Sequence, residues 1–183
     1  MTAITISTLI LVVLSVLGFL LLFRRTAGRS IVQLDDASLG THLRPVDLEA
    51  FRNLVDPAEE EFLRLSLPAW EFRSIQRKRL RAAVDYLEGV SHNAAMLLQW
   101  GQLALTSSDP QITEAAKRLV AEAAPLRLYA LIAVGKLYLK IAFPATTLRP
   151  AGIVNGYQSV SDRAAILGRL RDPAKPVLAS RAF

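Results

Sequence analysis

The sequence predicts an all-α protein, with a single N-terminal transmembrane helix followed by a cytoplasmic helical bundle built on a long antiparallel helical hairpin. Two observations lead to this fold class. The segment Ile4–Phe23 holds 20 residues without a charged side chain. Behind it, apolar residues recur at helical spacing over long stretches, and the alternation typical of strands is absent. Gly and Pro fall between these stretches, where helices begin and end.

The segment Ile4–Phe23 has the length and composition of a membrane span. Twenty helical residues extend about 30 Å, the thickness of the hydrocarbon core of a bilayer, and 15 of the 20 are Leu, Ile, Val or Phe. Arg24, Arg25 and Arg29 follow the segment, which argues against a cleaved signal peptide. The positive-inside rule then predicts an N-terminus outside and residues 24–183 in the cytoplasm, with the membrane as the partner of this segment.

Composition divides the chain into four predicted parts. We expect a transmembrane anchor over residues 1–25, a juxtamembrane linker over 26–44, a helical domain over 45–171 and a flexible tail over 172–183. The sequence contains no Cys, which excludes disulfides and thiolate chemistry.

Local start and stop signals predict the helices of the helical domain. Pro45–Val55 is typical of a short helix with Pro at its first position. Asp56 and Pro57 then form an N-cap and a first helical position, and a helical pattern continues from there to about Leu105. Pro68 should break that pattern near Ser66–Leu67.

A second start signal, Asp109 followed by Pro110, predicts another long helix that ends at about Phe143. A last helix lies within Ala151–Arg171. The short turn between the two long helices favours an antiparallel hairpin. We expect the short first and last helices to pack across its open end.

The sequence contains no motif for catalysis, a metal or a cofactor. Glu88 and His92 lie four residues apart on one helical face, but a di-iron bundle needs Glu-x-x-His on two helices and further carboxylates. We therefore predict a non-enzymatic protein without a metal or cofactor. An enzyme with an unrecognised site is kept as an alternative.

Charge is strongly segregated along the helical domain. Residues 35–61 hold eight acidic and two basic residues, whereas residues 62–81 hold six basic and one acidic residue. In the predicted hairpin, the basic run of the first long helix lies opposite two lysines of the second. The candidate residues for binding an anionic surface are Arg73, Arg77, Lys78, Arg79, Arg81, Lys136 and Lys140.

Clustered like charges favour the approach of something anionic. Three candidates stay open: the chain's own acidic segment Asp47–Glu61 together with Asp35 and Asp36, the anionic lipid of the cytoplasmic leaflet, or an acidic partner protein. Membrane tethering and the lack of interleaved aromatic residues argue against nucleic acid.

The leading hypothesis is a membrane-anchored helical scaffold or adaptor with a basic surface for anionic lipid or an acidic partner. An accessory subunit of a larger membrane protein complex is an alternative, because Leu126–Phe143 is apolar on more than one face. This segment fits a buried core helix, an interfacial helix or a partner-facing surface. A second span is disfavoured, because Lys136 and Lys140 lie within it.

Overall fold

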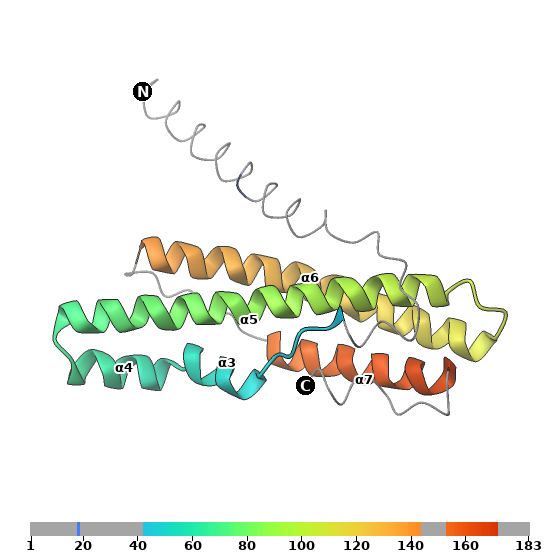
Figure 1. The fold of residues 1–183 in the computed structure, drawn as a ribbon, viewed down its shortest axis with the longest axis horizontal. Helices are drawn as coiled ribbons and strands as arrows, with labels where there is room; N and C mark the ends of the chain where they lie inside the picture. The colour runs from blue at the N-terminus through green and yellow to red at the C-terminus, as the bar shows by residue number, and fades with distance from the viewer. Residues whose placement is uncertain (1–17, 19–41, 144–152, 172–183) are drawn as a thin grey trace, which may run out of the picture. The chain divides into compact units, whose positions relative to one another are not determined.

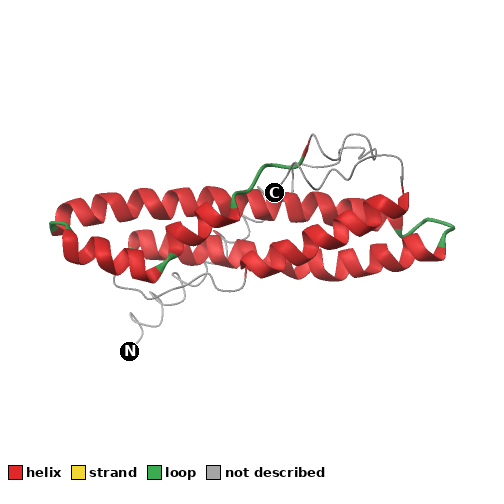
Figure 2. Ribbon diagram, turned by 90° about the horizontal axis from the view of Figure 1, so that it is seen from below, coloured by secondary structure: helices red, strands yellow, loops and turns green. Residues whose placement is uncertain are grey.

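A computed structural model describes Gly18, residues 42–143 and residues 153–171 of the chain. The predicted all-α fold is confirmed for these residues, which contain helices and short loops but no strand (Figure 2). The chain divides into two units, Met1–Val32 and Gln33–Phe183, and the predicted domain boundaries stay predictions. The described helices all belong to the second unit and are α3 (Leu48–Val55), α4 (Pro57–Ser66), α5 (Ala69–Ala104), α6 (Pro110–Ala142) and α7 (Ile153–Arg171).

Two helices begin at the predicted Asp-Pro pairs. The carboxylate of Asp56 accepts a hydrogen bond from the backbone N–H of Ala58 at 3.0 Å, and α4 starts at Pro57. The carboxylate of Asp109 accepts from the N–H of Gln111 at 2.8 Å, and α6 starts at Pro110. Each aspartate satisfies a backbone donor that has no partner within its helix.

The helix boundaries around Pro68 and Pro45 differ in how well the sequence predicted them. The expected break at Pro68 occurs, since α4 ends at Ser66 and α5 begins at Ala69. The expected start of the first helix at Pro45 is wrong. The helix α3 begins at Leu48, because Asp47 acts as its N-cap and accepts from the N–H of Ala50 at 2.9 Å.

The long helices α5 and α6 form a hairpin around the turn Leu105–Asp109. They span 36 and 33 residues and pack against each other through small side chains. A methyl group added at Gly101 would lie 3.0 Å from Val120 on the facing helix. Seven alanines of the two helices are at most 3% exposed and are Ala83, Ala94, Ala104, Ala116, Ala123, Ala130 and Ala133.

The other three helices follow one another in a row below α5 in Figure 1. The helix α3 buries Phe51, whose ring centroid lies 6.5 Å from that of Tyr86 on α5. The helix α7 packs mainly on α6. Its buried apolar side chains recur every three or four residues and are Tyr157, Val160, Ala164 and Leu167.

The position of α7 corrects the expectation that the last helix closes the open end of the hairpin. Arg163 of α7 forms an ion pair with Glu122 of α6 at 3.0 Å. The guanidinium carbon of Arg171 lies 5.6 Å from the centre of the Trp100 ring, near the end of α5. The helix α7 therefore covers the half of the hairpin next to the turn, while α3 and α4 cover the other half.

A buried polar junction joins three segments of the fold at Asn93. The side-chain oxygen of Asn93 accepts from the backbone N–H of Arg44 at 2.8 Å. Its amide nitrogen donates to the carbonyl oxygen of Arg44 at 2.7 Å and to the hydroxyl oxygen of Tyr157 at 2.6 Å. Asn93 thereby ties the segment before α3 and the first turn of α7 to the middle of α5.

The predicted location, a single-pass membrane protein with residues 24–183 in the cytoplasm, is contradicted. Within the described ranges, none of the helices combines the length and the apolar composition that crossing a bilayer requires. Even the most apolar stretch of α6, residues 126–142, carries Arg127, Lys136 and Lys140. The segment Ile4–Phe23, on which the prediction rested, lies outside the described residues except for Gly18.

We expect the Asn93→Ala substitution to lower the free energy of unfolding by roughly 2–3 kcal/mol, because it removes the hydrogen bonds that the buried Asn93 side chain makes with the Arg44 backbone and the Tyr157 hydroxyl. Urea denaturation of the two proteins measures this loss. The matched control is Asn155→Ala on the exposed face of α7, which should change stability by no more than about 0.5 kcal/mol. Equal losses in both variants would contradict the role assigned to Asn93.

Two glycine substitutions test the close approach of α5 and α6. Gly135→Ala should stabilise the protein by about 0.5–1 kcal/mol, because alanine favours the helix and the added methyl group meets open space. Gly101→Ala offers the same helical gain, but its methyl group would lie 3.0 Å from Val120. We expect the Gly101 variant to be less stable than the Gly135 variant by about 1 kcal/mol or more in thermal or urea unfolding. Equal stability would show that the contact is loose.

Candidate functional site

The helix α5 carries most of the basic residues that the sequence singles out. Arg73, Arg77 and Arg81 recur every four residues and therefore lie along one side of the helix, with Lys78 next to them. All four side chains are exposed. Within the described part of the chain, none of them makes an ion pair or a hydrogen bond. We call these four residues, Arg73, Arg77, Lys78 and Arg81, the basic face of α5.

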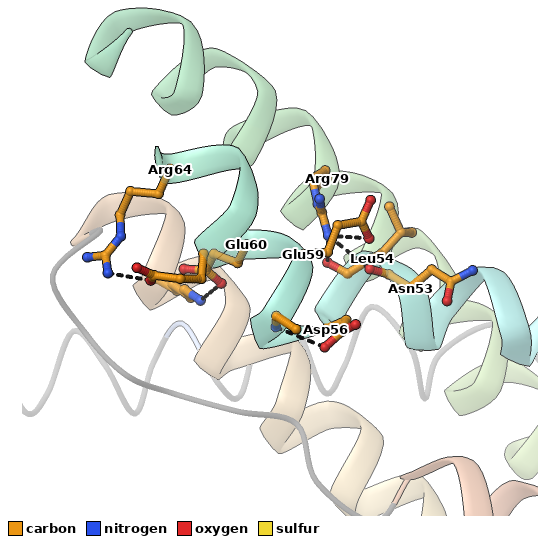
Figure 3. Close-up of polar contacts among 10 residues, drawn as sticks. Asn53, Leu54, Asp56, Glu59, Glu60, Arg64 and Arg79 are labelled. Atoms are coloured by element: carbon orange, nitrogen blue, oxygen red, sulfur yellow. Dashed lines mark hydrogen bonds and ion pairs between the residues drawn. The ribbon is translucent and has the colours of Figure 1, made fainter. Parts of the chain in front are cut away.

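Arg79, by contrast, is bound within the fold (Figure 3). Its guanidinium group donates to the backbone carbonyl oxygens of Asn53 at 2.9 Å and Leu54 at 3.5 Å, in the last turn of α3. It also pairs with the carboxylate of Glu59 at 3.0 Å, and its side chain is only 10% exposed. Arg79 thus satisfies the carbonyl end of α3, where a positive charge complements the helix dipole.

Lys140 of α6 is bound within the fold in the same way. Its ammonium group lies 2.6 Å from the carboxylate of Glu60 on α4, and its side chain is 13% exposed. Together with the pair of Arg79 and Glu59, this contact attaches the acidic helix α4 to both long helices. Lys136, one turn earlier on α6, is exposed and makes no ion pair within the described residues.

The acidic segment Asp47–Glu61 therefore folds back on two of the seven candidate residues, Arg79 and Lys140. This is the intramolecular alternative that the charge pattern left open. It neutralises neither Lys136 nor the basic face of α5. Asp35 and Asp36, the other predicted acidic partners, lie outside the described residues.

A small cavity lies where α4, α5 and α6 meet. Its volume is about 40 Å³, enough for one or a few water molecules or for the end of one polar side chain. The cavity brings Arg73, Arg77 and Lys140 together, whereas Lys78, Arg81 and Lys136 are not part of its wall. It is lined by Glu60, Phe72, Arg73, Gln76, Arg77, Leu80, Lys140 and Ile141.

Gln76 is a residue of this cavity that the sequence reasoning missed. Its side chain is 8% exposed, and its Oε1 atom has no hydrogen-bond partner within the described residues. Rotation of the side-chain amide by a half turn exchanges its oxygen with its N–H donors. Beside Arg73 and Arg77, an amide donor would complete a set of groups that bind a carboxylate, while Lys140 in the same wall is already paired with Glu60. The only signal in the sequence was an uncharged polar residue on the core side of a basic helix.

A second hollow, of about 380 Å³, lies between the start of α6 and the end of α7. Its charged side chains already have partners there. Arg118 pairs with Glu114 at 3.3 Å, and Arg163 pairs with Glu122 at 3.0 Å. In the cavity between α4, α5 and α6, Arg73 and Arg77 have no ion pair within the described residues, so this cavity is the better candidate for an anionic group.

His92 lies at the junction of α5 with the segment before α3. Its Nε2 atom lies 3.0 Å from the carbonyl oxygen of His42, so this nitrogen carries the proton of the hydrogen bond. No group of three potential ligands for a metal ion occurs among the described residues. His92, the strongest metal candidate of the sequence, contributes instead to the attachment of this segment.

Burial shifts the pKa of three groups around the core. It lowers the pKa of His92, with a smaller lowering from the charge of Arg44, while the hydrogen bond to His42 acts in the opposite direction. Burial also lowers the pKa of Arg127. It raises the pKa of the Tyr157 hydroxyl, against which the hydrogen bond with Asn93 acts. Each shift favours the uncharged form of the buried group.

The lowered pKa of His92 predicts a pH-dependent stability. The unfolded chain takes up a proton on this side chain as the pH falls through 6.5, whereas the folded chain does so only at a lower pH. This group therefore destabilises the fold progressively below that value, and the loss levels off below the folded pKa. His92→Gln keeps a donor for the His42 carbonyl and should reduce the difference between the unfolding free energies at about pH 5 and about pH 8. An unchanged difference would contradict this assignment.

Comparison with known proteins provides no relative from which a function could be carried over. No family model matches the chain, and no curated protein or solved structure matches it either. What the protein binds therefore has to be inferred from its own charged and apolar surfaces.

Proposed function

We propose that the protein is a non-enzymatic helical binding module whose basic face of α5 binds an acidic segment of a partner protein. The observation that carries this proposal is the set of four exposed basic side chains, Arg73, Arg77, Lys78 and Arg81, which have no ion pair within the described residues. Four positive charges on three turns of a helix repel one another, and an anionic partner relieves this repulsion.

The helix α4 supports a protein partner in particular. It is an acidic helix that packs on the basic helices with no buried residue of its own. Its attachment uses carboxylates on neighbouring positions, Glu59 on Arg79 and Glu60 on Lys140. The same chemistry, a row of carboxylates on a helix or an extended segment, fits the unpaired arginines of the basic face. Arginine binds carboxylates through two parallel hydrogen bonds, which gives such a contact direction as well as charge.

The cavity beside the basic face supports the same class of partner. Arg73 and Arg77 belong to both, and the buried amide of Gln76 lies at its wall. One carboxylate of the partner can enter the cavity while others pair with Lys78 and Arg81 outside. The partner is thus an acidic peptide segment with at least one carboxylate that reaches between α5 and α6.

A double charge reversal, Arg77→Glu with Arg81→Glu, should weaken binding of an acidic peptide by at least about tenfold, because both lost pairs become repulsive. The probe is a synthetic peptide of about 12 residues in which half of the residues are Glu, with a peptide that has Gln at those positions for comparison. Fluorescence anisotropy of the labelled peptides measures the dissociation constants, and added salt should weaken the binding.

The control variant reverses two exposed arginines elsewhere, Arg52 on α3 and Arg169 on α7. It has the same net charge as the test variant and should retain binding within about twofold. Equal losses in both variants would mean that only net charge matters and would overturn the proposal. The proposal would also be overturned if the unaltered protein did not bind the Glu peptide but bound phosphatidylserine vesicles or single-stranded RNA, and if the variant with Arg77→Glu and Arg81→Glu lost that binding. The partner would then be lipid or nucleic acid.

A further inference from the structure

The helix α4 packs on the hairpin with its charged side rather than with its most apolar side chains. Phe62 and Leu65 remain in solvent and are 66% and 79% exposed. The carboxylates of Glu59 and Glu60 instead pair with basic residues of the two long helices (Figure 3). A helix that completes a core buries its apolar stripe, whereas α4 has no buried residue. Ion pairs are therefore the main attachment of α4.

The helix α4 has a non-helical joint at each end. Asp56 separates it from α3, and Leu67 with Pro68 separates it from α5. The backbone of Asp56 and of Leu67 is extended, and residues at the ends of elements absorb the φ and ψ changes of hinge motions. A rotation of α4 about its own axis at these joints would carry Glu60 away from Lys140. The helix α3 would stay in place through the buried aromatic ring that it packs on α5.

Glu60 also belongs to the wall of the cavity between α4, α5 and α6. The charged residues of that wall are Glu60, Arg73, Arg77 and Lys140. In the closed arrangement the Glu60 carboxylate lies 2.6 Å from the ammonium group of Lys140, and it repels any other carboxylate that enters. Without Glu60, the wall has three positive charges beside the buried amide of Gln76. An anionic ligand therefore favours the arrangement in which Glu60 has left.

The neighbouring glutamates of α4 do not take part in this competition. Glu59 pairs with Arg79, which the backbone of α3 also holds. Glu61 pairs with Arg64 within α4 itself. Neither glutamate belongs to the cavity wall that the described residues form. Glu60 is thus the residue of α4 that occupies the place of a partner's carboxylate.

We propose that α4 is an acidic strap that Glu60 holds closed on Lys140, and that the acidic segment of the partner opens the strap by pairing with Lys140 in place of Glu60. This inference rests on the proposed function, because it gives the partner the same chemistry. Opening adds Lys140 to Arg73 and Arg77 as ligands of the partner's carboxylate. Because only the open form offers all three, the apparent affinity for the partner falls as the open fraction falls.

The binding experiment compares two variants of α4 that lose the same charge. Glu60→Gln releases Lys140, whereas Glu61→Gln removes only a pair within α4. In fluorescence anisotropy with the Glu peptide, Glu60→Gln should bind at least about fivefold more tightly than the unaltered protein. Glu61→Gln should bind within about twofold of the unaltered protein, since an exposed pair on one helix contributes little. Equal gains in both variants, or a gain in neither, would overturn the inference.

A thiol on the inner side of α4 measures the movement of the strap itself. Leu63 is half-buried and lies three residues after Glu60, on the same side of the helix. The chain contains no Cys, so Leu63→Cys provides a single thiol for iodoacetamide. Both the Glu peptide and the added Glu60→Gln substitution should accelerate its alkylation by about threefold or more, because opening exposes this side. The control thiol, Leu65→Cys, replaces a residue that is already 79% exposed, and its rate should not change.

The two measurements distinguish failure of the strap from failure of the proposed function. If the Glu peptide binds but leaves the alkylation of Leu63→Cys unchanged or slows it, the peptide binds beside a closed α4. That result would overturn the inference and leave the proposed function standing. If neither the unaltered protein nor Glu60→Gln binds the peptide, the proposed function fails and the inference fails with it. Binding that appears only in Glu60→Gln would support both.

Discussion

The close packing of α5 against α6 is the contact on which the rest of the structure depends. Gly101 lets the two helices approach closely, and each helix has more than thirty residues over which dispersion contacts can accumulate. The groove beside this pair then accepts α3 and α4 over one half and α7 over the other. Asn93 attaches both the segment before α3 and the helix α7 to α5, because it hydrogen-bonds to Arg44 and to Tyr157.

The same hairpin determines how the charges are used. It holds Arg79 and Lys140 where the acidic helix α4 can reach both of them. The basic face of α5 forms no ion pair with α4. The charges of Arg79 and Lys140 are therefore neutralised by α4, whereas the charges of the basic face still repel one another. The protein combines a charge contact that serves its own fold with a charged surface that is open to another molecule.

The sequence predicted what local chemistry determines. The helix starts at Asp56 with Pro57 and at Asp109 with Pro110, and the break at Pro68, depend only on neighbouring residues. They could therefore be predicted without the contacts between distant segments. The partner of Arg79, the burial of Gln76 and the position of α7 depend on contacts between distant segments, which a helical period does not encode. The predicted membrane location is contradicted, because none of the described helices is long and apolar enough to cross a bilayer. The segment Ile4–Phe23, on which that prediction rested, lies outside the described residues except for Gly18.

The lack of any buried residue in α4 has a consequence for the energetics of the fold. A helix whose attachment consists mainly of ion pairs can detach without exposing the core, so its opening costs much less free energy than unfolding of the hairpin. Its amide protons should then exchange with solvent through a local opening, while those of α5 and α6 wait for global unfolding. Ionic strength acts on such an opening directly, since salt screens the pairs that close it. The salt concentration of the surrounding solution can therefore set the fraction of molecules in which α4 is attached to the hairpin.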